Sequence, residues 1–358
     1  MAYISFQPSD FFNNVIWSGD NTSPINITGL GFQPDFVWGK LRNTGYSNQL
    51  YDSVRGFGND KEIQSDTTTV QGGGTADQYG YLSGVVADGF TATAGSDGGA
   101  DKYGYWNESG KTYVAWNWKA GTTTGLTGGT LTPSAYSFNT TSGFGIYAYT
   151  GTGANATIPH GLGVAPHLVI VKHLSGASDW EVGNSSFTSW AYHLGLNLTT
   201  AESSSATCWN STAPTSTVFS VGTNGAINGS GQTFVAYCFA SIKGYSKFGS
   251  YTGNANADGP FIYTGFRPAY FLLRRIDVGN DWVVMDNKIN PFNLADTRLR
   301  PNNSGAEATS AIKSLDILSN GVKIRTSDAE FNAVGTYIYA AFAEFPFVSS
   351  NSIPTVAR

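Results

Sequence analysis

The residues of this chain that come nearest to a catalytic arrangement are two pairs of acids, each beside a tryptophan. They are Asp179 with Glu181, and Asp281 with Asp286. Hydrolysis of a glycosidic bond needs two carboxyl groups about 5–9 Å apart across one sugar. The spacing of the first pair places both side chains on one face of a strand, and the second pair is spaced differently. We therefore interpret all four as exposed turn acids and predict neither catalytic residues nor enzymatic activity.

Metal-binding patterns are weak. Zinc sites need three or four ligands, and no Cys-x-x-Cys or His-x-x-x-His spacing occurs, although all four histidines fall in the middle third of the chain. Asp97 and Asp101 stand in a glycine-rich string that could offer several oxygens to calcium, but the spacing differs from that of an EF-hand loop. A plain Gly/Asp turn explains the string better. We predict no metal site and no cofactor.

Nucleophilic catalysis finds no support either. No Gly-x-Ser-x-Gly turn links a strand to a helix. The two cysteines, Cys208 and Cys238, are too few for a disulfide framework, so we expect two buried thiols.

Aromatic residues give a more useful signal, since they make up 14 % of the chain and aromatic faces stack on apolar sugar faces. Most of them lie in or beside repeated strands, where a core requires them. The aromatics outside those strands are our candidates for ligand contact. They are Tyr103, Tyr105, Trp106, Trp190 and Trp209.

The elements that must position these residues are repeated three times. A motif of Trp or Tyr, then Ser or Thr, then Gly begins seventeen residues ahead of Pro34, Pro166 and Pro268. An apolar run follows each proline, and a second matching apolar run closes each unit. A period near one hundred residues is too long for a solenoid, so each unit should be a domain-sized body with its own core.

Short apolar runs bounded by Gly, Asn, Asp and Pro predict strands throughout, with tight turns at Asp88-Gly89 and Asn320-Gly321. No stretch keeps a helical apolar stripe over three turns. We expect an all-β protein of three tandem antiparallel β-sandwich or jelly-roll-like repeat units. The predicted domains are residues 1–120, which include an N-terminal segment, residues 133–242, and residues 247–358, which include a C-terminal tail.

The composition favours a neutral polar surface, because only 13 % of the 358 residues are charged and 44 are glycine. The net charge of −5 and the lack of a basic block argue against nucleic-acid binding. No run is long and apolar enough to insert into a membrane, and residues 1–8 do not resemble a signal peptide. Such a surface suits sugar contact or close subunit packing.

Residues 31–38, 48–56 and 113–121, and most of the last third of the chain, resemble a repeated domain of unassigned function in tail-fibre-like structural proteins of marine bacteriophages. The resemblance covers almost the whole chain. It implies a β-rich fold and a location in the virion, with assembly in the host cytoplasm. It brings no catalytic residues.

We therefore expect a virion structural protein, of the tail-fibre or receptor-binding type, that contacts a host-surface glycan or receptor. Its partners would be other virion proteins and copies of itself, with a homotrimer as the expected oligomer. The alternatives are a capsid-decorating or tail-associated scaffold without a ligand and, less favoured, a glycan depolymerase. The N-terminal residues 1–14, which contain Phe6, Phe11 and Phe12, either dock on another virion protein or add a strand to the first unit.

Overall fold

The structure is a computed structural model that describes residues 4–346, and nearly all of its regular structure is β-strand, as the sequence predicts. The strands within each sheet pair antiparallel. Within the described residues, no helix is long and apolar enough to cross a membrane.

The first segment, residues 12–118, forms a sheet in the order β1-β7-β3-β4 and a smaller sheet in the order β2-β6-β5. Its strands are β1 (Phe12–Ser18), β2 (Ile25–Thr28), β3 (Phe36–Leu41), β4 (Gln49–Asp52), β5 (Tyr81–Val86), β6 (Gly89–Thr93) and β7 (Thr112–Trp118). Short helical turns are η1 (Pro8–Asp10), just before the segment, and α1 (Ala76–Tyr79) and η2 (Asp101–Tyr103).

The second segment, residues 135–239, forms a sheet in the order β14-β13-β12-β11-β16-β9-β8 and the pair β10-β15. Its strands are β8 (Ala135–Asn139), β9 (Phe144–Thr150), β10 (Ala156–Pro159), β11 (Leu168–His173), β12 (Glu181–Asn184), β13 (Tyr192–Gly195), β14 (Ser203–Ser204), β15 (Val218–Val221) and β16 (Thr233–Phe239). One helical turn, α2 (Gly225–Asn228), precedes β16.

The third segment, residues 246–346, forms a sheet in the order β17-β25-β19-β20-β21-β22 and a smaller sheet in the order β18-β24-β23. Its strands are β17 (Ser246–Gly253), β18 (Phe261–Tyr263), β19 (Phe266–Arg275), β20 (Val283–Asp286), β21 (Thr297–Leu299), β22 (Ala308–Thr309), β23 (Leu315–Leu318), β24 (Gly321–Ile324) and β25 (Gly335–Pro346).

One four-strand order recurs in the three larger sheets: β1-β7-β3-β4, β9-β16-β11-β12 and β17-β25-β19-β20. Each larger sheet has a small sheet of two or three strands from the same segment beside it, so the strand orders do not confirm a jelly roll. The strands of each segment fall within one predicted domain range, except that β17 begins one residue before residue 247. The division into separate domains stays a prediction. The C-terminal tail, residues 347–358, lies outside the described residues.

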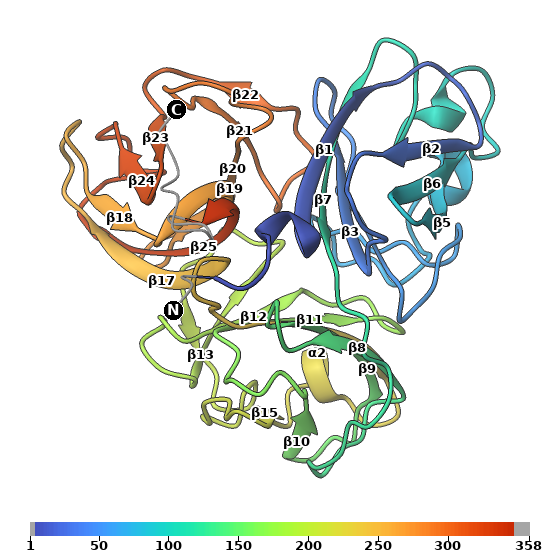
Figure 1. The fold of residues 1–358 in the computed structure, drawn as a ribbon. Helices are drawn as coiled ribbons and strands as arrows, with labels where there is room; N and C mark the ends of the chain where they lie inside the picture. The colour runs from blue at the N-terminus through green and yellow to red at the C-terminus, as the bar shows by residue number, and fades with distance from the viewer. Residues whose placement is uncertain (1–3, 347–358) are drawn as a thin grey trace.

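The three segments surround a common centre, with the larger sheets turned inward and the small sheets toward the outside (Figure 1). The inward side chains of all three larger sheets belong to one buried apolar cluster. The residues two and four positions after each proline point into it, as the two-residue period of a strand requires. They are Phe36 and Trp38, Leu168 and Ile170, and Tyr270 and Leu272.

Each larger sheet also buries its outer face, against the small sheet of its own segment, in three further apolar clusters. Sheets buried on both faces explain why the strands read as continuous apolar runs rather than alternating ones. The expectation of one separate core per unit is therefore half right. Each segment has a core of its own between its larger and its small sheet, but the largest cluster, at the centre, is shared by all three.

Buried cations join each segment to the next around the centre. They stand six residues after the three prolines and are Lys40, Lys172 and Arg274. Burial lowers the pKa of each lysine to about 8 and that of the arginine to about 10. Because a buried charge needs polar partners, each cation must find acceptors inside the fold.

The acceptors are backbone carbonyls of a neighbouring segment. Lys172 Nζ donates to Thr68 O at 3.0 Å, which links the second segment to the first. Lys40 Nζ donates to Ser304 O at 3.0 Å, which links the first segment to the third. Arg274 donates to carbonyls of residues 198 and 200, which link the third segment to the second. The three contacts run in one rotational direction and close a ring.

The residues fourteen positions after the prolines also donate hydrogen bonds across the boundaries, each from the same segment to the same neighbour as the buried cation. Trp180 Nε1 donates to Gln64 O at 2.8 Å, and Trp282 Nε1 donates to Gly195 O at 3.0 Å. In the first segment the equivalent residue is Asn48, whose side-chain amide donates to Asn303 O at 3.2 Å. A side-chain N–H therefore crosses each of the three boundaries at the same place.

A third set of contacts is present at two boundaries and missing at one. Tyr237 OH donates to Asp52 Oδ2 at 2.7 Å, and Trp116 Nε1 donates to Asp286 Oδ2 at 2.7 Å. The equivalent pair at the third boundary is an alanine and an asparagine, Ala340 and Asn184. Donor and acceptor are both replaced there, so no buried acid is left without its partner.

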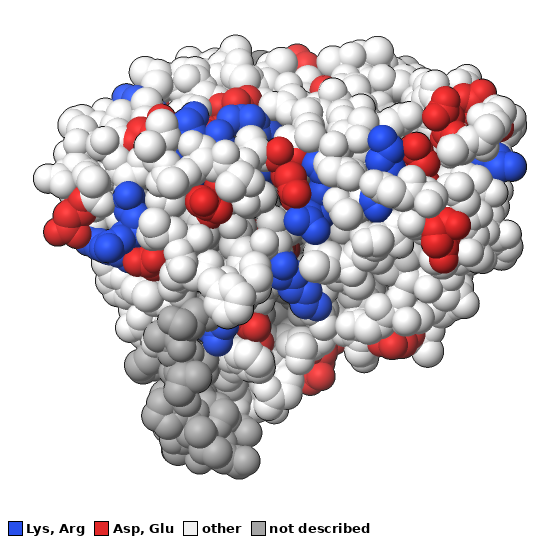
Figure 2. All heavy atoms as spheres, turned by 90° about the horizontal axis from the view of Figure 1, so that it is seen from above, with Lys and Arg blue, Asp and Glu red and all other residues white. Residues whose placement is uncertain are grey.

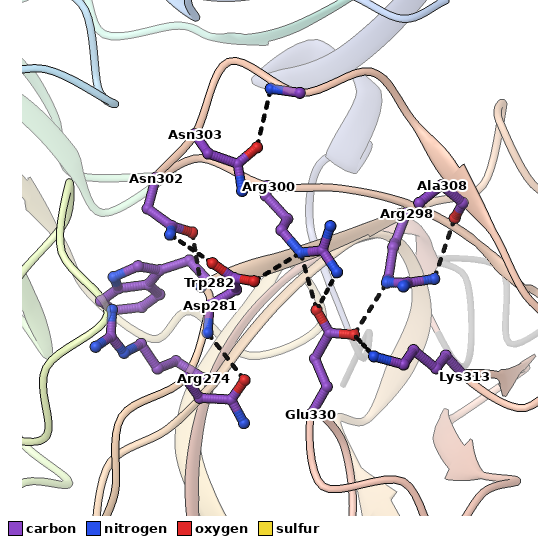
Figure 3. A network of polar contacts seen from close by, with 12 residues as sticks. Arg274, Asp281, Trp282, Arg298, Arg300, Asn302, Asn303, Ala308, Lys313 and Glu330 are labelled. Carbon is purple, nitrogen blue, oxygen red and sulfur yellow. Dashed lines mark hydrogen bonds and ion pairs between the residues drawn. The ribbon is translucent and has the colours of Figure 1, made fainter. Parts of the chain in front are cut away.

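A network of charges holds the loop that receives Lys40 and Asn48 (Figure 3). Glu330 is buried and forms ion pairs with Arg298 Nε at 3.0 Å, Arg300 Nη2 at 2.9 Å and Lys313 Nζ at 2.9 Å. Burial raises the pKa of this carboxyl, but the hydrogen bond from Lys313 and the neighbouring guanidinium groups outweigh it and leave the pKa lowered. Three cations around one carboxylate indicate a structural clamp.

The described part of the N-terminal segment packs against its own chain. Phe12 begins β1, which pairs with β7, and its ring stacks on Phe342 at 5.1 Å. Phe6 and Phe11 contact each other and Tyr245. The aromatics of this segment thus fill the shared cluster, and the second of the two sequence-based readings, an added strand, fits them.

Two predicted hairpins form, β5–β6 and β23–β24, and each loop lies one residue earlier than the predicted dipeptide. Val86 pairs with Gly89, and Leu318 pairs with Gly321, so the loops are residues 87–88 and 319–320.

Loss of the Tyr237 hydroxyl should weaken the contact between the first and second segments. We expect Tyr237→Phe to lower the free energy of unfolding by about 2 kcal/mol, because a buried hydrogen bond to a carboxylate is removed. Tyr245→Phe is the matched control, since the Tyr245 hydroxyl is buried without a hydrogen-bond partner. Its loss should change stability by less than about 0.5 kcal/mol. Urea unfolding followed by fluorescence measures both, and equal losses would contradict the assignment.

Candidate functional site

The five aromatics predicted to contact a ligand do not form one surface. Tyr105, Trp106 and Trp209 are buried, with 5 %, 2 % and 0 % of their surface exposed. Tyr103 and Trp190 are half-buried. A ring that stacks on a sugar must present a face to solvent, so the three buried residues are corrected to core positions.

Glycine residues opposite these rings are the one signal of this outcome that the sequence contains. Trp106 lies over β3 at Gly39, where a Cβ atom would stand 2.5 Å from the indole ring. The part of the first segment that carries Trp106 therefore folds back and covers the outer face of its own sheet. Likewise, Gly183 leaves room for the rings of Trp190 and Trp209, which meet edge to face at 6.0 Å.

The acidic pairs are engaged in the fold. Asp286 is fully buried and accepts from Trp116, while Asp281 pairs with Arg300 at 3.0 Å. Asp179 accepts from the Asn197 amide at 2.7 Å. None of these contacts leaves two carboxyl groups facing each other across an open cleft, which a glycosidase requires.

An apolar cavity lies at the centre and holds no ligand-sized space. Its volume is about 20 Å³, and aromatic and aliphatic side chains from all three segments line it. A void of this size is near the minimum for a single water, and its apolar lining offers water no partners. The shared core is therefore a packing element.

An exposed aromatic pair lies on the small sheet of the third segment. Phe261 and Tyr263 are 46 % and 55 % exposed. They flank Ile262, which points into the apolar core between the two sheets of the third segment. Alternate residues of a strand face the same side about 6.6 Å apart, so the two rings stand side by side on one sheet face. Phe261 extends over Gly321 of β24, where a Cβ would stand 3.1 Å from its ring.

The equivalent strands of the other segments carry no such rings. Asn26 and Thr28 flank the buried Ile27 on β2, and Thr157 and Pro159 flank the buried Ile158 on β10. The fold therefore does not require aromatics at these positions.

A polar groove adjoins Tyr263. Its volume is about 460 Å³, and it is lined by Tyr263, by the joint between the second and third segments and by the turn after β18. The lining residues of the joint include Ser241, Ser246, Lys243 and Lys247. Hydroxyl and ammonium groups beside an aromatic face are the two kinds of contact that a sugar uses. Phe261, Tyr263 and this groove are called the β18 surface below.

The charged groups visible in Figure 2 are scattered among neutral residues, with both signs side by side. No broad patch of one sign covers that face, as expected from the sequence.

One group of potential metal ligands occurs among the described residues: Glu181 on β12, His193 on β13 and Cys208 in the loop after β14. His193 Nδ1 lies 2.5 Å from Glu181 Oε2. Hydrogen bonding to Cys208 and then to Glu181 raises the pKa of His193 to about 10. The three residues lie 12 and 15 positions apart, a spacing that matches no short motif, and so sequence reasoning missed them.

A buried carboxyl with an altered pKa lies in the first segment. Glu62 is 1 % exposed. Burial raises the pKa of its carboxyl to about 7, although the backbone N–H groups of Ala76 and Gly74 act in the opposite direction. Gly74 passes so close that a Cβ there would stand 2.1 Å from Glu62 Oε1. The loop that contains Gly74 thus shields the carboxyl from water.

The comparisons with known proteins give a family and no assigned activity. A family model described as Domain of unknown function (DUF7483) matches residues 7–346. No curated protein and no solved structure matches the chain.

The Glu62 carboxyl should make stability depend on pH. Its pKa of about 7 in the folded state lies above the ordinary value of 4.5, so its contribution is fully present below pH 4.5 and is lost as the pH rises through 7. Glu62→Gln removes this loss. We expect the variant to gain up to about 3 kcal/mol over the natural protein between pH 4.5 and pH 8.

Unfolding by urea at both pH values measures this difference, and comparison of two proteins cancels the other titrating groups. Glu202→Gln, at a half-exposed carboxyl, is the control and should show no such gain. A Glu62→Gln gain that is equal at both pH values would contradict the prediction.

Proposed function

We propose that this chain, which belongs to the DUF7483 family, is a non-enzymatic structural protein of a virion that contacts a host-surface glycan through its β18 surface. The observation that carries the proposal is the pair of exposed rings, Phe261 and Tyr263, beside a polar groove. Large aromatic side chains are costly to leave in water, and a pair on one flat sheet face is typical of a binding surface.

The differences among the three segments support this choice. The equivalent positions on β2 are Asn26 and Thr28, and the inward faces of all three larger sheets are packed. Side chains that differ at positions without a role in folding are free to serve a ligand. We infer a binding function for the third segment and a framework function for the shared core.

The virion location rests on the resemblance of the sequence to tail-fibre-like structural proteins of marine bacteriophages. The three segments, closed around one core, would serve there as a rigid support, and a homotrimer would multiply weak glycan sites by avidity. Such a protein would be assembled in the host cytoplasm with other virion proteins.

A scaffold without a ligand is the second candidate. The same exposed rings favour it if they are covered by another virion protein, because aromatic pairs also anchor protein interfaces. A glycan depolymerase is less favoured, since the acids beside Trp180 and Trp282 are held in hydrogen bonds and ion pairs.

Removal of both rings should weaken glycan binding. We expect Phe261→Ala with Tyr263→Ala to reduce affinity by roughly 30-fold to 150-fold, because each ring contributes about 1–1.5 kcal/mol of stacking. Asn26→Ala with Thr28→Ala at the equivalent positions is the matched control and should bind normally. Binding of labelled protein to intact host cells, before and after periodate oxidation of their glycans, measures the effect.

Binding that saturates, is lost after periodate treatment and is lost in the ring variant supports the proposal. Absence of binding by the natural protein favours the scaffold. Binding that the ring variant retains would move the glycan site elsewhere.

A further inference from the structure

A cluster in the second segment offers three different ligand types to one point. Glu181 lies on β12, and His193 lies on the neighbouring strand β13, two residues before Gly195, which pairs with Glu181. The thiol of Cys208 comes from the loop that follows β14. One carboxylate oxygen, one imidazole nitrogen and the sulfur all lie within 4.8 Å of one another. Two neighbouring strands and one loop of the second segment therefore bring three ligand atoms close together.

Side-chain shifts of about 1 Å would fit this cluster to a small tetrahedral cation. Ligand bonds to zinc are about 2.0–2.3 Å long, which places any two ligand atoms about 3.3–3.6 Å apart. Glu181 Oε2 and His193 Nδ1 lie 2.5 Å apart, so a shift of about 1 Å would admit a metal between them. The His193 side chain is 21 % exposed, which leaves its ring room to move and gives solvent access to the fourth position.

The surroundings supply the outer partners that metal ligands use. Ser203 Oγ lies 2.9 Å from His193 Nε2, so the second ring nitrogen can donate a hydrogen bond while Nδ1 faces the cluster. Asn224 Nδ2 donates to Cys208 Sγ at 3.0 Å, a contact that helps to fix the position of the sulfur.

An apolar wall closes one side of the cluster. Trp190 and Trp209 pack over Gly183, two residues beyond Glu181 on the same face of β12. This wall limits water near the ligands and strengthens electrostatic contacts there. Two of the three tryptophans predicted from the sequence to contact a ligand would thus border a metal centre.

We propose that Glu181, His193 and Cys208 bind one zinc ion, with water in the fourth position. The ion is held by a carboxylate, an imidazole and a thiolate, a donor set that suits zinc. It joins the loop carrying Cys208 to the neighbouring strands β12 and β13. The proposal departs from the sequence-based expectation of no metal, and the site is separate from the β18 surface.

Cobalt is the probe for the site, because four-coordinate Co²⁺ bound to a thiolate absorbs in the visible and near-ultraviolet range. The full chain is stripped with a chelator under reducing conditions and titrated with Co²⁺. We expect one equivalent to bind with a sulfur-to-cobalt charge-transfer band, and one equivalent of Zn²⁺ to remove that band.

Cys208→Ala should abolish the band, whereas Cys238→Ala, at the other buried thiol, should keep it. His193→Gln changes a half-exposed side chain and should weaken Co²⁺ binding at least tenfold, so the test stands even if Cys208→Ala fails to fold. Failure of the natural protein to bind stoichiometric Co²⁺, or a band that survives Cys208→Ala, would overturn the proposal.

The same variants separate the metal site from a reactive thiol. In a zinc site, Zn²⁺ slows alkylation of Cys208 by iodoacetamide in the natural protein and has no such effect in His193→Gln. Rapid alkylation of Cys208 that Zn²⁺ does not slow would instead indicate a nucleophilic thiol beside an imidazole, and would contradict metal binding.

Discussion

The shared burial of three sheet faces is the constraint on which the rest of this structure depends. Each larger sheet has an apolar inner face that its own segment does not cover, and the three faces complete one another at the centre. Lys40, Lys172 and Arg274 then fix the angle between neighbours, because a buried cation is stable only where the carbonyls of the next segment receive it. The ring of contacts closes, so no segment can rotate without exposing a charge to an apolar core.

This closed frame separates folding from function. Inward positions are restricted by packing, and the polar links between segments are restricted by the need to pair buried groups. Even the exception obeys this rule, since Ala340 and Asn184 replace donor and acceptor together at one boundary. The outer small sheets carry fewer such restrictions. Differences between the segments therefore concentrate there and at sheet edges, where the β18 surface and the Glu181, His193 and Cys208 cluster lie.

The aromatic content illustrates the same division. Much of the aromatic content fills cores. Trp118, for example, contacts rings from all three segments, including Phe36, Phe239 and Phe342. An aromatic residue in this chain is thus informative about binding only where the fold leaves its ring exposed. Phe261 and Tyr263 meet that condition, and Trp106 and Trp209 do not.

The sequence by itself determined the all-β class, the three related segments and two of the hairpins, because strand periodicity, turn residues and an internal repeat are local properties of the chain. It also led us to expect buried thiols at Cys208 and Cys238, which the structure confirms. Only the tertiary structure decided which aromatics are exposed, that the central core is shared, and that Glu181, His193 and Cys208 meet. Those features depend on contacts between residues far apart in the chain, and side-chain burial is set by what other segments place on top, which no local pattern records.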